Sequence, residues 1–134
     1  MKTKELMISN VVEINGEPQR LRHISRRKVG YCPMGSPNRR YAHISEIKPR
    51  PITEELLLKN GFADDTGTLC FKYYCLNMEH HTVTVRGISN TPGRDWSVRI
   101  ANNDTQTVAS ADVQHLHQLQ NILNIMDIKL DLVV

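Results

Sequence analysis

Aromatic residues are scarce in this chain: Phe, Trp and Tyr make up 5% of 134 residues, with one tryptophan, Trp96. Surfaces built from many stacked rings are therefore not expected. No apolar run approaches the roughly 20 residues needed to cross a bilayer, and residues 1–10 lack the apolar stretch of a signal peptide. The three cysteines form no disulfide-framework spacing, which favours a reducing cytoplasm.

Motifs for catalysis are also missing. The sequence contains no phosphate-binding P-loop, no nucleophile elbow and no dinucleotide-binding glycine pattern. No spacing implies a nucleophile next to a general base. These absences predict a protein that is not an enzyme and that needs no cofactor.

A metal site is not expected, although the chain has six histidines. Neither Cys-x-x-Cys nor His-x-x-x-His spacing is present. His115 and His117 fall within the last predicted helix, where residues two apart point about 200° apart. That geometry would keep the two rings from serving one ion.

Charge is distributed unevenly along the chain. The net charge is +3, but residues 1–50 hold 11 Lys and Arg against 4 Asp and Glu, whereas residues 51–134 hold 6 against 10. The first part is therefore net +7 and the second net −4. Such a basic segment indicates an acidic partner rather than a particular fold.

The basic residues of the first part are the candidate nucleic-acid-binding residues. If the strands of this part converge, their side chains would match a phosphate backbone, and Tyr31 and Tyr41 would stack on bases. The alternative without a function in binding is a solvent-exposed basic face, some of whose charges pair with acidic residues of residues 51–134. The candidate residues are Arg20, Arg22, Arg26, Arg27, Lys28, Arg39, Arg40, Lys48 and Arg50.

Several short strands joined by tight turns are expected in the first part. Asn15-Gly16 is a strong hairpin turn because both residues tolerate positive φ, and a bulge is expected near Leu21. This pattern predicts a small, curled, SH3-like β-barrel over residues 1–48. The strands are expected at residues 6–14, 19–25, 28–32 and 41–47.

For residues 49–134 the sequence predicts helices together with an antiparallel sheet, which makes the whole chain α+β. These residues form either a lobe separate from residues 1–48 or one continuous domain with them. Thr53 is a good N-cap for a helix of about two turns that ends at Asn60-Gly61. A last helix over residues 112–126, capped by Asp112, carries an apolar stripe at helical spacing. An antiparallel meander over residues 68–76, 81–88 and 95–101 and a terminal strand over 128–134 are also expected.

Three segments carry a family resemblance. They are KEL-x-I-x-N-x-V at residues 4–12, SEIKP-x-PITEELLLKNGF at residues 45–62, and HLHQLQNI at residues 115–122. In this order they resemble small uncharacterised proteins of Bacteroides-type genomes, phages and mobile elements. The resemblance covers nearly the whole chain and implies a phage or mobile-element accessory protein, but it implies no catalytic residue.

A protein partner is the alternative to DNA or RNA. The chain would then be an interaction module, for example an inhibitor of a host system. It would pair with a host or phage protein, or with a second copy through an open strand edge or the last helix. Four amide side chains mark the polar side of that helix, and plain helix surface is the competing interpretation. They are Gln118, Gln120, Asn121 and Asn124.

Overall fold

The computed structural model describes residues 5–33, 36–69, 71–87, 96–130 and 132. The chain divides into two compact units: unit 1 is Met1–Arg50 with His115–Asp127, and unit 2 is Pro51–Gln114 with Ile128–Val134. Each unit contains one five-stranded antiparallel sheet. The described residues also form two α-helices, so the predicted α+β class is confirmed.

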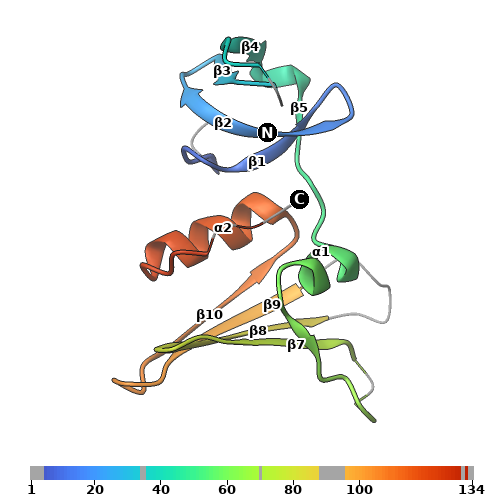
Figure 1. The fold of residues 1–134 in the computed structure, drawn as a ribbon, viewed down its shortest axis with the longest axis vertical. Coiled ribbons are helices and arrows are strands. Elements are labelled where there is room, and N and C mark those ends of the chain that lie inside the picture. The colour runs from blue at the N-terminus through green and yellow to red at the C-terminus, as the bar shows by residue number, and fades with distance from the viewer. Residues whose placement is uncertain (1–4, 34–35, 70, 88–95, 131, 133–134) are drawn as a thin grey trace. The chain divides into compact units, whose positions relative to one another are not determined.

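Unit 1 contains a strongly curled sheet in the strand order β4-β3-β2-β1-β5 (Figure 1). The turn between β1 and β2 holds Asn15 at φ 54° and Gly16 at φ 80°, which is the conformation predicted for a tight hairpin. The pairing of β2 with β3 shifts register between Leu21 and His23, where a bulge was expected. The elements are β1 (Val11–Ile14), β2 (Glu17–Ile24), β3 (Lys28–Tyr31), β4 (Arg40–His43), the 3₁₀ helix η2 (Ile44–Glu46) and β5 (Ile47–Lys48).

The core of unit 1 lies on the concave side of this sheet. Apolar side chains from all five strands and from the segment before β1 meet there. Burial of this apolar surface is the main favourable term holding the short strands together. The buried members are Leu6, Val12, Ile14, Leu21, Val29, Tyr31, Ala42 and Ile47.

Helix α2 (Leu116–Ile125) belongs to unit 1, although the sequence places it with the second part of the chain. It begins after His115, whose φ of −127° and ψ of 153° are extended. The Leu116 N–H donates to the Arg50 carbonyl at 2.8 Å, so the chain re-enters unit 1 beside the point where it left. Leu116, Leu119 and Leu123 are buried, as the predicted apolar stripe requires.

Unit 2 starts with helix α1 (Glu54–Lys59). Its boundaries follow the predicted signals: the Leu56 N–H donates to Thr53 Oγ1 at 3.1 Å, and Gly61 follows the helix at φ 87°. Phe62 is buried and its N–H donates to the Leu57 carbonyl at 3.1 Å. The predicted N-cap and the predicted helix end are therefore both confirmed.

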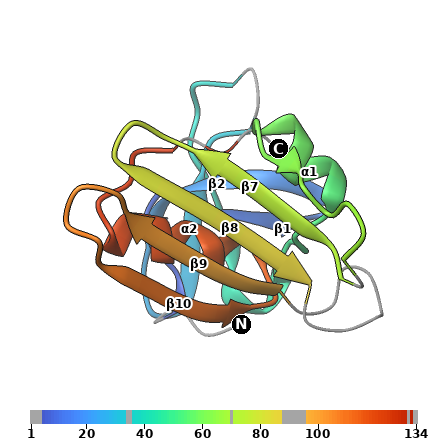
Figure 2. The ribbon, with the colours of Figure 1, turned by 90° about the horizontal axis from the view of Figure 1, so that it is seen from below.

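The sheet of unit 2 follows the order β10-β9-β8-β7-β6, and Figure 2 shows its four longer strands side by side. Alternation along these strands buries one face, which carries Tyr74, Val83, Val85, Trp96, Val98 and Ile100. The Trp96 indole N–H donates to the Ile52 carbonyl at 3.2 Å. The strands are β6 (Ala63–Asp64), β7 (Tyr73–Asn77), β8 (His81–Gly87), β9 (Trp96–Asn102) and β10 (Val108–Val113).

The structure corrects several predicted boundaries. The expected three-stranded meander is part of a five-stranded sheet, because β10 pairs along β9 and β6 along β7. Strand β10 was missed because its sequence, VASADV, is mostly exposed and lacks apolar alternation. Asp112 lies in β10 opposite Ser97, so it is not the cap of α2.

Four predicted strands also differ from those observed. Strand β1 begins at Val11 rather than at residue 6. Strand β7 begins at Tyr73 rather than at residue 68, and Cys70 lies outside the described residues. The segment predicted as one strand over 41–47 is interrupted by η2. The described part of the predicted terminal strand, residues 128–130 and 132, forms no β-strand. Within the described residues, no helix is both long and apolar enough to cross a membrane.

Candidate functional site

Four side chains gather on the outer face of β2, β3 and β4 around a glycine. A Cβ on Gly30 would lie 3.0 Å from His23 Cβ and 3.1 Å from both Arg39 Cδ and Tyr41 Cε1. Gly30 therefore lets neighbouring side chains close over the strand, which a larger residue would prevent. We call His23, Lys28, Arg39 and Tyr41 the Tyr41 cluster.

The ring of Tyr41 is the centre of this cluster and is 52% exposed. Lys28 Nζ lies 4.7 Å from the ring centroid in a cation–π contact. The His23 ring meets it edge-on, with centroids 6.1 Å apart and an interplanar angle of 80°. An exposed aromatic ring held between cationic side chains can stack on a base while the cations contact phosphates.

Five more of the predicted basic residues lie on β2, in the β2–β3 turn and at the start of β4. Arg26 and Arg27 are exposed in the turn, and Arg22 is exposed beside the bulge. Arg20 Nη1 donates to the Ser9 carbonyl at 3.1 Å. Arg40 is exposed at the start of β4, but it pairs with Tyr31, whose side chain faces the core, so Arg40 does not start from the face that carries Tyr41. These residues give the β2–β4 part of the sheet an excess of positive charge.

Lys48 and Arg50 do not join the Tyr41 cluster. Strand β5 is separated from β3 by β1 and β2 in the sheet order. Lys48 lies opposite Glu13 in the β1–β5 pairing, and Arg50 Nη1 lies 3.7 Å from Glu13 Oε2. Glu13 thus offsets part of their charge, which leaves them less suited to a phosphate backbone.

Tyr31 was expected to stack on bases, and this expectation is wrong. Its side chain belongs to the core of unit 1 and is only 7% exposed. The reason is the alternation of β3, which sends Val29 and Tyr31 to the concave side and Gly30 to the outer side. Only Tyr41 of the two predicted rings is available to a ligand.

His115 and His117 are closer than the helical argument allowed. Their rings stack with centroids 5.8 Å apart and an interplanar angle of 8°. The 200° argument fails because His115 has extended backbone angles and stands before the helix. Burial lowers the pKa of both rings, and the nearby His115 lowers that of His117 further. His117 Nδ1 is buried and has no hydrogen-bond partner among the residues that the structure describes.

The described residues contain no group of three or more His, Cys, Asp or Glu side chains that could hold a metal ion. His80 contacts acidic neighbours instead: its Nδ1 lies 2.6 Å from Asp104 Oδ2. Its Nε2 lies 3.7 Å from Glu79 Oε1. These exposed contacts lie in the β7–β8 and β9–β10 turns, and they account for the position of the His80 ring without a bound metal ion.

The amides of α2 are mostly internal rather than a partner-binding face. Gln120 Oε1 accepts the Val11 N–H at 2.9 Å. Asn121 Oδ1 accepts from Asn10 Nδ2 at 2.9 Å, and Asn121 Nδ2 donates to the Glu5 carbonyl at 3.0 Å. Gln118 Oε1 accepts the His115 N–H at 3.0 Å. Of the four predicted amides, Asn124 is the exposed one.

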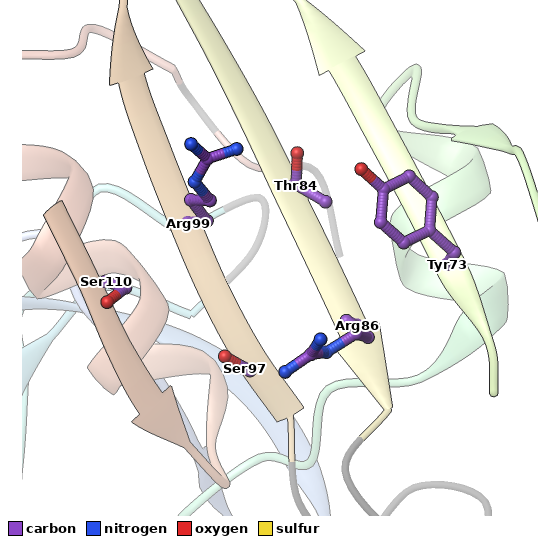
Figure 3. Close-up of a pocket in the computed structure, with 6 residues that line it drawn as sticks. All are labelled: Tyr73, Thr84, Arg86, Ser97, Arg99 and Ser110. Carbon is purple, nitrogen blue, oxygen red and sulfur yellow. The ribbon is translucent and has the colours of Figure 1, made fainter. Parts of the chain in front are cut away.

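A second polar surface, not singled out from the sequence, lies on the outer face of the unit 2 sheet. Figure 3 shows the side chains that surround a hollow of about 350 Å³ on this face. The alternation of Thr84 with Val85 and of Arg99 with Val98 was a usable signal, but the pairing of β8 with β9 was needed to join them. The lining residues are Tyr73, Thr84, Arg86, Ser97, Arg99 and Ser110.

Comparison of the chain with protein-family models, with curated protein sequences and with solved structures found no match.

Proposed function

We propose that this chain is a non-enzymatic accessory protein of a phage or mobile element that binds single-stranded nucleic acid through the Tyr41 cluster. The observation that carries the proposal is the exposed Tyr41 ring with Lys28 Nζ 4.7 Å from its centroid. A base needs an aromatic surface to stack on, and the phosphates on either side need cations. The proposed origin rests on the resemblance of the three sequence segments.

Single strands suit this surface better than a duplex. One exposed ring offers a stacking partner only to a base that is not already stacked inside a helix. An exposed cation–π contact is worth about 0.5–1 kcal/mol, so Lys28 can turn from the ring to a phosphate at small cost. Arg39, which closes over Gly30 beside the ring, is the second cation within reach.

We also propose that unit 1 is an SH3-like barrel. The support is its order β4-β3-β2-β1-β5, in which the last short strand returns to pair with the first. The 3₁₀ helix η2 between β4 and β5 makes the tight connection that such closure requires. A small curled sheet of this kind places its turns and outer face within reach of a ligand.

The test is fluorescence anisotropy of labelled oligothymidine titrated with the protein at several salt concentrations. We expect salt-dependent binding, with a slope of about 0.7 for each phosphate contacted on a single strand. Tyr41→Ala should weaken binding by about 1–3 kcal/mol, the range for loss of one stacked base. Lys28→Gln should lower the slope by about one phosphate contact.

Leu58→Ala is the control, because Leu58 lies on α1 in unit 2, is as exposed as Tyr41 at 52%, and lies outside the Tyr41 cluster. Its affinity for oligothymidine should equal that of the unchanged protein. Absence of binding at low salt, or equal losses of affinity for Tyr41→Ala and Leu58→Ala, would remove the proposal.

A protein partner or a second copy remains the alternative function. It is favoured by β10, which ends its sheet and has Val108 50% exposed. Such an edge offers unpaired backbone groups to another strand. Light scattering coupled to size exclusion tests the homodimer form, since a monomeric mass at high concentration would exclude it.

A further inference from the structure

Two arginines stand as diagonal neighbours on the outer face of the unit 2 sheet. Arg86 on β8 pairs with Ser97 on β9, and Arg99 on β9 pairs with Thr84 on β8. Figure 3 shows these four side chains at the corners of a quadrilateral, with the two arginines at opposite corners. Diagonal neighbours in an antiparallel sheet lie about 7–8 Å apart, so both long side chains can reach one small ligand.

The hollow between the arginines is made by short side chains. Thr84, Ser97 and Ser110 stand beside the longer Arg86 and Arg99 and leave a volume of about 350 Å³. This volume is at the lower end of the range for small-molecule sites. Every lining residue carries a hydroxyl or a guanidinium group, and none carries a carboxylate. The site therefore offers hydrogen-bond donors to an anion.

Nothing within the described part of the chain neutralises these two charges by an ion pair. The guanidinium of Arg86 lies 5.3 Å from the Phe71 ring centroid, a contact that leaves its N–H edge free to donate. Asp112 lies opposite Ser97 on the same face, yet among the described residues it forms no ion pair with either arginine. Two neighbouring positive charges repel each other, and an anion between them would relieve that repulsion.

We propose that this face binds a phosphate monoester. Arg86 and Arg99 donate to its oxygens from two sides, and the hydroxyls of Thr84 and Ser97 supply further hydrogen bonds. A phosphate monoester carries a charge of about −1.5 to −2 at neutral pH, which matches two guanidinium groups. Tyr73, at the rim, contacts the organic part of the ligand.

The test is a titration of ¹⁵N-labelled protein with sodium phosphate, followed by amide chemical shifts, with sodium chloride at matched ionic strength as the reference. We expect saturable shifts at Thr84, Ser97 and Ser110 with phosphate and none with chloride. Arg99→Gln should weaken phosphate binding about tenfold, the effect of losing one charge-assisted contact. Lys129→Gln removes an exposed charge elsewhere in unit 2 and should change nothing.

Asp112→Asn provides a gain-of-affinity test. Removing this negative charge from the same face should tighten phosphate binding about two- to threefold. Shifts that fail to saturate, that appear equally in chloride, or that survive Arg99→Gln unchanged would overturn the proposal. So would an Asp112→Asn variant that binds phosphate more weakly than the unchanged protein.

Further titrations identify the source of the phosphate group and separate this site from the Tyr41 cluster. Adenosine monophosphate and a 5′-phosphorylated oligothymidine both carry the monoester, whereas an unphosphorylated oligothymidine does not. Unit 2 shifts with either of the first two support the proposal, and equal unit 2 shifts with the third contradict it. Tyr41→Ala should leave the phosphate shifts intact. Oligonucleotide binding without phosphate shifts would remove this inference and leave the proposed function standing.

Discussion

The amide network between α2 and the start of β1 permits a quantitative test of what holds unit 1 together. Asn10 is fully buried. Its Oδ1 accepts the Met7 N–H at 2.7 Å, and its Nδ2 donates to Asn121 Oδ1 at 2.9 Å. Asn10→Ala would remove both bonds and leave the Met7 N–H and the Asn121 oxygen without these partners. A lost hydrogen bond costs about 0.5–1.5 kcal/mol, and a buried polar group left unsatisfied costs about 1–3 kcal/mol.

We therefore expect Asn10→Ala to lower the free energy of unfolding by about 2–4 kcal/mol, which is a large share of a small domain's stability. Asn121→Ala, combined with Asn10→Ala in a double-mutant cycle, should give a coupling energy of about 1 kcal/mol. Urea denaturation followed by far-ultraviolet circular dichroism measures each term.

Asn124→Ala is the control, because Asn124 is an exposed amide on the same helix. Its effect should stay within about 0.5 kcal/mol. If Asn10→Ala costs no more than Asn124→Ala, or if the cycle shows no coupling, the network does not hold α2 to β1 and the reasoning fails.

The remaining predictions concern pH and two glycines. Because burial holds the pKa of His117 and of His115 below 6.5, the unfolded chain takes up protons that the folded chain does not. The free energy of unfolding should therefore be highest above that value and fall as the pH drops below it, although Glu5 raises the pKa of both rings and so opposes the effect. His117→Gln should make the urea midpoint depend less on pH between about pH 7.5 and about pH 5. An unchanged dependence on pH would contradict this prediction. Gly16→Ala meets no atom within 4 Å, so its expected cost of about 1–2 kcal/mol comes from φ +80° alone, and a cost near zero by urea denaturation would refute it. Gly30→Ala should cost about 1–3 kcal/mol by crowding the Tyr41 cluster and should also weaken oligothymidine binding in the anisotropy assay, whereas unchanged stability and binding would show that the cluster tolerates a Cβ.

Local sequence signals were enough to predict the helix ends and tight turns of the fold. Thr53, Asn60 and Gly61 gave the boundaries of α1, and Asn15-Gly16 gave the first hairpin, because caps and positive-φ turns depend on a few neighbouring residues. Strand β10 was missed because its residues are small and exposed, so its existence depends on pairing with β9 rather than on its own pattern.

The candidate site could be predicted only in part, because its residues are brought together by strand pairing. Charge counting pointed to the first part of the chain, but it could not separate Lys28, next to Tyr41, from Arg50, next to Glu13. That difference is set by strand order and register, which sequence spacing alone does not determine. Likewise, the alternation of β3 decided that Tyr31 packs inward while Tyr41 remains exposed.

The hydrogen bond from the Leu116 N–H to the Arg50 carbonyl makes residues 51–114 an insertion within unit 1. During translation, all five strands of unit 1 leave the ribosome before the helix that satisfies Asn10 and the Val11 N–H has been made. A nascent or truncated chain that stops before residue 115 therefore carries unit 1 in an incomplete form. Because the insertion leaves and returns at adjacent residues, an isolated unit 1 can be made by replacing residues 51–114 with a short glycine linker and ending the chain at Asp127.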